Sequence, residues 1–363
     1  MPEMTKEERV LCALSREEPD RVPLYDLVDN VAVIEHYAGR KLTLENAPDV
    51  IPEGLSRCLD TTRVWMPSAP GIRVDDRGFT HERRDWFNEW QVGTPFDDMR
   101  GLLAWVGAEV ERLEAWRPAS VAAEPKELLE WKRKFGGTVI PATTAGEALA
   151  DAYILVGLDR FVFMEAEDPE LTQRWIDAIH SATMRRLQSE RGRRAVSPVA
   201  WLFADLAYKE RLMFSRSYLH QHGVFRRMAD ICALYRGLGL KVIFHSDGFI
   251  RPIVPDLIAA GVDALAPVET SAGLDLSDLK AEFGDRVAFV GGVDLGAISS
   301  GTPDDVRAIT LRALAAAGHG GGFILGSSSE ELYDSIPPEN IFTMFETTWE
   351  CGRYPIGQYF SVA

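Results

Sequence analysis

The chain has 363 residues, of which 46% are apolar and 26% charged, and its 39 Lys and Arg against 55 Asp and Glu give a net charge of −16. This balance is typical of a globular protein with a large core, and the acidity argues against nucleic acid as a partner, because such binding depends on neutralising phosphates. No apolar stretch is long enough for a bilayer, residues 1–10 do not resemble a secretory leader, and the four cysteines form no C-x-x-C motif. We therefore expect a cytoplasmic protein that does not bind membranes.

The predicted secondary structure alternates between strands and helices. A capping box at Thr5–Glu8 opens a first helix, and Asp168-Pro-Glu170, Thr302-Pro-Asp-Asp305 and Ser335–Pro338 give further helix starts. Apolar runs predict strands at 21–26, 62–66, 137–142, 199–205, 241–247, 264–269, 287–294 and 322–326. Alternation of this kind implies a parallel sheet, and eight strands with no obvious edge predict an α/β protein built as a closed TIM-type (β/α)8 barrel.

Residues 67–125 interrupt this alternation. The stretch holds Trp86, Phe87 and Trp90 among charged residues, and its aromatic content argues against disorder. We expect a long insertion between the second and third strands, folded over one end of the barrel.

Polar residues follow the predicted strands at the end where TIM barrels place their active sites. Their convergence after apolar runs makes His245, Asp247 and Glu269 the leading candidates, with Asp205 after the fourth strand. Asp after a strand also serves as a turn or a helix cap, and this alternative stays open for Asp26, Asp29 and Asp294. The candidate substrate-binding residues are Asp26, Asn30, Glu165, Tyr208, Trp86, Trp90, Asp294, Ser327 and Ser328.

The candidate rim is acidic and poor in Lys and Arg, so a polyanionic ligand would be repelled. It suits a cation, a metal ion or a substrate that needs a proton. Aromatic residues near the rim could hold a flat ring or a methylated ammonium. For Trp201 and Phe203 we expect ordinary core packing instead.

Several segments resemble the uroporphyrinogen decarboxylase superfamily. They are 5–14, 18–23, His245-Ser-Asp-Gly248, 260–264, Gly291-Gly-Val-Asp294, 301–303, 320–325 and 337–341. The resemblance extends over nearly the whole chain and implies one barrel domain, 1–363, with the insertion 67–125 over its mouth.

The superfamily contains decarboxylases and corrinoid-dependent methyltransferases, and the resemblance is closer to the second branch. The decarboxylases carry an arginine-rich loop of R-x-A-G-R type just after the first strand, whereas 24–30 here reads LYDLVDN and contains no arginine. Methyltransferases that act on coenzyme M bind zinc through an H-x-C pair on strand five and a later Cys. Here Asp247 replaces the first Cys, and Ser327 or Ser328 stands near the second, so the soft ligands are missing.

The resemblance therefore implies transfer of a methyl group from a small donor, a methoxyaromatic or a methylated amine, to the cobalt of a separate corrinoid protein. The D-x-H-x-x-G signature of corrinoid-binding modules is absent from the chain. His245, Asp247 and Glu269 would act as acids, or would bind a metal such as Zn²⁺ that activates the leaving atom. A decarboxylase-like lyase of tetrapyrrole metabolism and a non-catalytic barrel subunit are the alternatives, and formation of a homodimer is left open.

Overall fold

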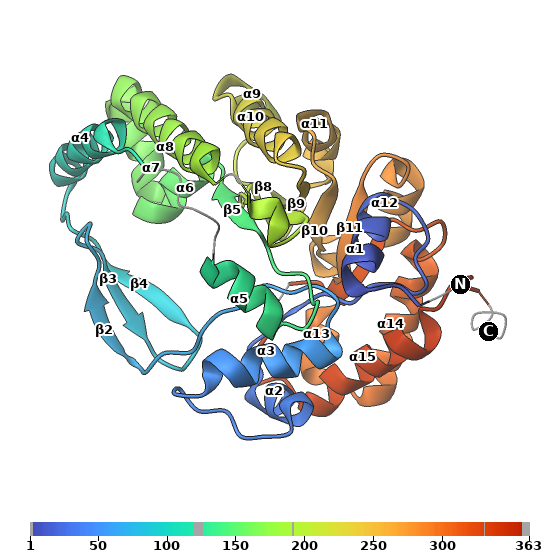
Figure 1. The fold of residues 1–363 in the computed structure, drawn as a ribbon. Helices are drawn as coiled ribbons and strands as arrows, with labels where there is room; N and C mark the ends of the chain where they lie inside the picture. Colours follow the sequence, from blue (N-terminus) through green and yellow to red (C-terminus); the bar gives the residue numbers. More distant parts are fainter. Residues whose placement is uncertain (1–2, 119–125, 191, 330, 358–363) are drawn as a thin grey trace.

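The computed structural model describes residues 3–118, 126–190, 192–329 and 331–357, and its centre is a TIM barrel (Figure 1). Six parallel strands lie side by side in the order β12-β11-β10-β9-β6-β5. Their bounds are β5 (Thr143–Gly146), β6 (Val199–Phe203), β9 (Lys241–His245), β10 (Ala264–Val268), β11 (Ala288–Val293) and β12 (Phe323–Ser327). Five of these strands, β6, β9, β10, β11 and β12, confirm predicted strands, whereas β5 lies just after the predicted third strand at 137–142.

The first and second strands close the barrel through isolated parallel bridges. Leu24 pairs with Leu325 of β12, Tyr25 pairs with Thr61, and Thr61 pairs with Val139, which leads into β5. The sequence placed the second strand at 62–66, but the pairing lies at Thr61. It placed the third at 137–142, where only Val139 forms a bridge, and β5 begins after that range, at Thr143. A short pair of parallel strands, β1 (Leu27–Val28) and β13 (Glu331–Leu332), extends the contact between the first and last strands.

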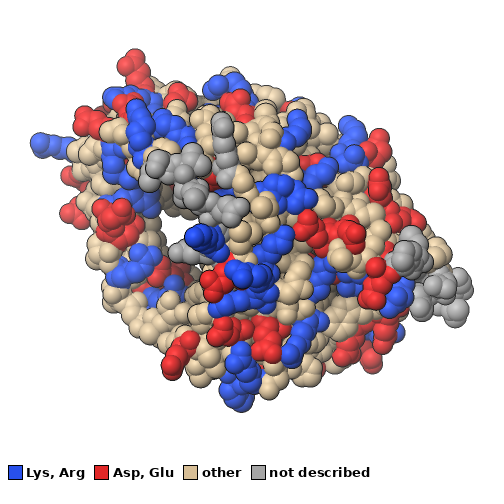
Figure 2. Space-filling model, in the orientation of Figure 1, with Lys and Arg blue, Asp and Glu red and all other residues tan. Residues whose placement is uncertain are grey.

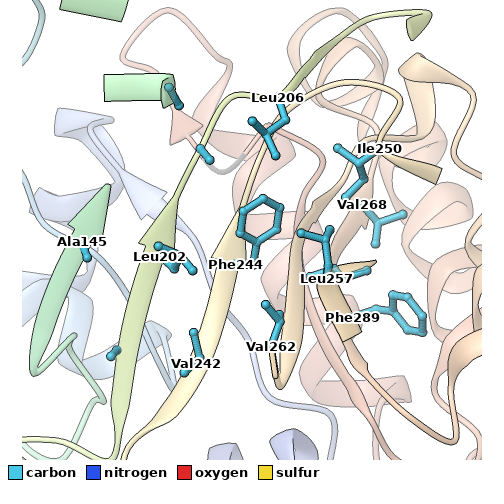
Figure 3. Packing of buried hydrophobic residues seen from close by; sticks show 14 of the residues in the cluster. Ala145, Leu202, Leu206, Val242, Phe244, Ile250, Leu257, Val262, Val268 and Phe289 are labelled. Carbon is cyan, nitrogen blue, oxygen red and sulfur yellow. The ribbon is translucent and has the colours of Figure 1, made fainter. Parts of the chain in front are cut away.

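Alternation along each strand separates the inside of the barrel from its outside. Val242 and Phe244 of β9 pack outward with residues of the surrounding helices, as Figure 3 shows, whereas Ile243 belongs to the cluster that fills the interior. Helix α1 (Lys6–Leu14) starts with the predicted capping box, and its Val10 and Leu14 join that interior cluster. The interior is therefore a packed core rather than a pore.

Helices surround the barrel, and the predicted caps at Asp168 and Thr302 are present. The helices are α2 (Val31–Ala38), α3 (Ala47–Cys58), α6 (Ala148–Val156), α7 (Leu158–Glu167), α8 (Pro169–Ser189), α9 (Arg216–Gln221), α10 (Val224–Gly237), α11 (Val254–Ala260), α12 (Leu276–Phe283), α13 (Leu295–Ser300), α14 (Pro303–Ala317) and α15 (Pro338–Cys351). Nowhere in the described ranges is a helix both long and apolar enough to cross a bilayer.

The insertion contributes an antiparallel sheet that stands apart from the barrel strands in Figure 1. The sheet comprises β2 (Gly71–Val74), β3 (Thr80–Arg83) and β4 (Glu89–Gly93), and α4 (Met99–Ala115) and α5 (Lys126–Lys134) follow. The last predicted insertion residues, 119–125, lie outside the described part of the chain. A hydrogen bond from the Gln91 side chain to the Leu155 carbonyl ties the sheet to the end of α6.

Positive and negative side chains are mixed on the face that Figure 2 shows. On the face that carries α1 and α5, Lys and Arg are interspersed with Asp and Glu (Figure 2).

A buried ion pair connects the end of β5 to α10. Glu147 and Arg227 are both fully buried; Glu147 accepts from Arg227 at 2.7 Å and also from the Leu149 and Ala150 amides. We expect Glu147→Ala to lower the free energy of unfolding by about 3–5 kcal/mol, because Arg227 stays buried without its carboxylate. Urea denaturation beside the exposed control Glu346→Ala tests this. A loss of stability no larger than that of the control would show that this ion pair does not stabilise the fold.

Candidate functional site

Three of the predicted residues converge where β6 and β9 end. The Nε2 atom of His245 lies 3.5 Å from Oδ1 of Asp205 and 4.0 Å from Oδ2 of Asp247. The ligand atoms of the three residues all lie within 4.8 Å of one another. The Asp205 and Asp247 side chains are 46% and 47% exposed, whereas His245 is only 13% exposed. We call these residues the mouth cluster, and it combines one imidazole with two solvent-accessible carboxylates.

Backbone contacts fix the positions of the mouth cluster. The Ala204 amide donates to the His245 carbonyl, and the hydroxyl of Tyr153 donates to the Asp205 carbonyl. Burial by itself raises the pKa of Asp205, but hydrogen bonding and charge from His245, together with the Asp247 backbone amide, outweigh it and the pKa is lowered. Asp205 therefore stays ionised at lower pH than an ordinary aspartate.

Glu269, the third leading candidate, lies outside the mouth cluster. Its Oε2 accepts from the Gly248 amide at 2.7 Å and its Oε1 accepts from the Ser271 hydroxyl. Gly248 has φ +85°, and a Cβ there would lie 2.6 Å from the backbone of Tyr208. Glu269 thus holds the tight turn that follows Asp247, and its contacts are with that turn rather than with the mouth cluster.

An aromatic wall lies beside the cluster. Trp201 and Phe203 stack with ring centroids 5.8 Å apart, Tyr25 lies 5.2 Å from Trp201, and Phe203 lies 5.3 Å from His245. Trp201 belongs to the barrel interior and Phe203 packs against it. The expected core packing is therefore present for Trp201, whereas Phe203 is only partly buried against that core. Both rings lie on the inside of the barrel, because residues two apart on a strand share one face.

Arg63, which the sequence reasoning missed, corrects the expected charge of the rim. Its guanidinium lies 5.0 Å from the ring centroids of both Trp201 and Phe203, and its Nε donates to the Tyr25 hydroxyl. It also contributes to the lowered pKa of Asp205. The mouth is therefore acidic with an embedded arginine. Its signal was weak, because Arg63 follows the second strand, the least regular one.

Several predicted substrate-binding residues hold the fold together. Asp26, fully buried, accepts from the amide and the hydroxyl of Ser327, which ties the first strand to the last. Ser328 accepts from the Leu295 amide, and Asp294 caps α13 by accepting from the Ala297 amide. Asn30 caps α2 and donates to the carbonyls of Tyr333 and Ile336. For these residues the capping and turn alternative is the one that the contacts support.

The other predicted substrate-binding residues lie around the mouth or beyond it. Glu165, on α7, accepts from the Tyr218 hydroxyl and lies 3.2 Å from His222, so it belongs to a separate polar group. Tyr208 is 42% exposed on the β7 (Ala207–Tyr208)–β8 (Arg211–Leu212) hairpin and packs against Arg211. Trp90 is 45% exposed beside Arg84, and Trp86 is partly buried against the main core. The structure does not bring these four side chains into the mouth cluster.

The donor atoms of the mouth cluster fit a hard-to-borderline divalent cation. Zn²⁺ binds His nitrogen and carboxylate oxygen at about 2.0–2.2 Å, so tetrahedral ligand atoms lie roughly 3.3–3.6 Å apart. The observed 3.5 Å and 4.0 Å separations are close to this range. Three protein ligands leave a fourth position for a reacting group, as in catalytic zinc sites.

Comparison with known proteins places the chain in a family. The family model of uroporphyrinogen decarboxylase (URO-D) matches residues 152–350, more than half of the sequence. A methyltransferase from Methanosarcina mazei has a similar structure, with a TM-score of 0.65, 18% identity, and coverage of 96% of this chain and 99% of that chain. At this identity the similarity shows the shared fold alone, and no curated protein matches. By its sequence and its barrel, the chain belongs to the uroporphyrinogen decarboxylase family.

Proposed function

We propose that the protein is a methyltransferase that moves a methyl group from a small donor to the cobalt of a separate corrinoid protein. The observation that carries this proposal is the mouth cluster, an imidazole between two carboxylates beside an aromatic wall at the open end of the barrel. The fold shared with the methyltransferase from Methanosarcina mazei supports it.

Each part of the mouth would contribute to displacement of the leaving atom. The half-buried Phe203 and Arg63 would position a flat donor, and this fixes the methyl carbon for in-line attack from the open side. His245, Asp205 and Asp247 would hold a Zn²⁺ ion, which as a Lewis acid stabilises the negative charge that develops on a leaving oxygen. Glu269 would keep Asp247 in place through the Gly248 turn.

The proposal is tested with the purified chain, reduced cobalamin as acceptor, and a panel of methoxybenzenes and methylated amines. We expect at least one donor class to methylate the cobalt, which is measured as a change in the absorbance of the cobalamin. Transfer should be faster after the protein is loaded with Zn²⁺. Absence of transfer from every donor with a Zn²⁺-loaded protein would count against the proposal.

The same mouth should not process uroporphyrinogen. That substrate carries eight carboxylates, and the described mouth offers Arg63 beside the exposed carboxylates of Asp205 and Asp247, so desolvation and like charge oppose binding. We expect no coproporphyrinogen by chromatography after incubation with uroporphyrinogen. Its formation at a rate above the uncatalysed background would favour the lyase alternative instead.

A further inference from the structure

The antiparallel sheet of the insertion has two chemically different faces. Residues that pair directly across such a sheet share a face, and so do alternate residues along each strand. By the observed register, one face, which we call the inner face, comprises Gly71, Arg73, His81, Arg83, Glu89 and Gln91. The other, which we call the outer face, comprises Ile72, Val74, Thr80, Glu82, Trp90 and Val92.

The inner face is polar and turned toward the rest of the molecule. Glu89 accepts from Arg73 and lies 3.4 Å from Arg83. The side chains of Arg83 and Glu89 are only 17% and 20% exposed. On the same face the Gln91 amide donates to the Leu155 carbonyl at the end of α6. The charged side of the sheet is therefore both paired and largely buried.

The outer face is apolar and open to solvent. Ile72 is 73% exposed and Val74 is 64% exposed, both on the edge strand β2. Trp90 and Val92 of β4 are 45% and 50% exposed. An antiparallel sheet with one solvated face normally turns its apolar side chains to the core and its polar ones to water. This sheet does the reverse, so its apolar face lacks the cover that such a face has in a folded protein.

The size of the outer face suits a contact between proteins. Its four apolar side chains expose roughly 400 Å² together, which is the scale of the patches that mark interaction sites on monomeric proteins. Glu82 and Arg84 at its rim are 33% and 63% exposed and enlarge the surface. With this rim the outer face approaches the area of about 800 Å² that each partner contributes to a stable complex of standard size.

The charges of the sheet favour a second copy of the chain as the occupant. The whole chain has a net charge of −16, so two copies repel each other over most of their surface. Residues 71–93 carry four Arg against five Asp and Glu, and 4 − 5 gives only −1. At the rim, Nη2 of Arg84 lies 2.7 Å from Oε2 of Glu82, and the Arg84 guanidinium lies 5.5 Å from the Trp90 ring centroid. A rim with one base and one acid is complementary to its own copy across a two-fold axis.

We propose that the outer face is the contact surface of a homodimer, in which two copies pack their insertion sheets face to face across a two-fold axis. Packed sheets lie about 10 Å apart with interdigitating side chains, so Ile72 and Trp90 of each copy fill the space between them. Because Gln91 on the inner face contacts the α6 of its own copy, the two barrels lie on the outer sides of the joined sheets. The dimer does not depend on the proposed methyl transfer.

The first experiment is sedimentation velocity of the full chain over a series of concentrations from nanomolar to high micromolar. We expect the wild type to sediment as a dimer at micromolar concentration. Ile72→Glu and Val92→Glu should each raise the dimer dissociation constant at least about 10²-fold, because each places like charges from both copies in one apolar contact. Phe163→Glu is the matched control, since Phe163 is 68% exposed but lies on α7, outside the sheet, and its dimer should be as tight as that of the wild type.

The second experiment separates a lost contact from a damaged sheet. Val92→Glu and Val92→Lys should each be monomeric, and an equimolar mixture of the two should form a dimer again, because opposite charges then meet across the axis. Amide exchange of residues 71–93 in the wild type should slow as the concentration rises through the dimer dissociation constant. In Val92→Glu this exchange should not depend on concentration.

A wild type that stays monomeric at every concentration would overturn the proposal, and the outer face would then be left for a different protein. A dimer that persists in Ile72→Glu and Val92→Glu, or that dissociates in Phe163→Glu alone, would place the contact elsewhere and overturn it as well.

Discussion

Replacing His245 by alanine is expected to slow methyl transfer about 10²–10⁴-fold and to remove tight Zn²⁺ binding. The imidazole lies between the two carboxylates of the mouth cluster, and an oxygen of each lies within 4.0 Å of its Nε2 atom. Without the imidazole, the carboxylates of Asp205 and Asp247 remain, and their side chains are 46% and 47% exposed. Two carboxylates that are this exposed to water should bind a divalent cation only weakly. Calorimetric titration with Zn²⁺ and the cobalamin assay measure the two effects.

The control for this prediction is another histidine. His319 is exposed after α14 and far along the chain from the cluster, so His319→Ala should keep both Zn²⁺ binding and transfer. Thermal unfolding of both variants should resemble that of the wild type, because His245 lies at a strand end and contributes little core packing. A His245→Ala variant with full transfer rates would rule out the assigned site.

The barrel was predictable because its signals are local and repeated. Each apolar run is short, ends in a polar residue and is followed by a helix start, and eight such units admit few topologies. The second strand was placed less well because only isolated bridges at Thr61 define it. The third was placed too early because the apolar run at 137–142 precedes β5, which begins at Thr143.

The site was predictable in part, for a reason that the contacts make clear. Residues at strand ends meet at the mouth whatever their role, so a prediction from position alone puts residues of different roles in one group. His245 and Asp247 belong to the mouth cluster, whereas Asp294 caps α13 and Asp26 connects the first strand to the last. Only the partners of each carboxylate distinguish these cases, and partners such as the Ser327 hydroxyl come from distant parts of the chain. Arg63 was missed because a loop residue has no periodic pattern to reveal it.

Sequence and geometry allow Asp247 to be either a metal ligand or an acid, and two substitutions distinguish these roles. If Asp247 is a metal ligand, Asp247→Asn should weaken Zn²⁺ binding and slow transfer by orders of magnitude, because the site loses one of its two negative charges. Asp247→Cys should instead retain Zn²⁺ and shift selectivity away from Mn²⁺ and Mg²⁺, since a thiolate is a softer ligand.

If Asp247 were only an acid, neither substitution would change metal affinity, and both would slow transfer alike. Asp205 does not supply this acid function in its place, since its lowered pKa keeps it ionised. Competition titrations with Zn²⁺ and Mn²⁺ on the wild type and both variants read the ligand role directly. Wild-type Zn²⁺ affinity in Asp247→Asn would contradict it. We expect the ligand role, because the carboxylate lies 4.0 Å from the same imidazole nitrogen that Asp205 faces.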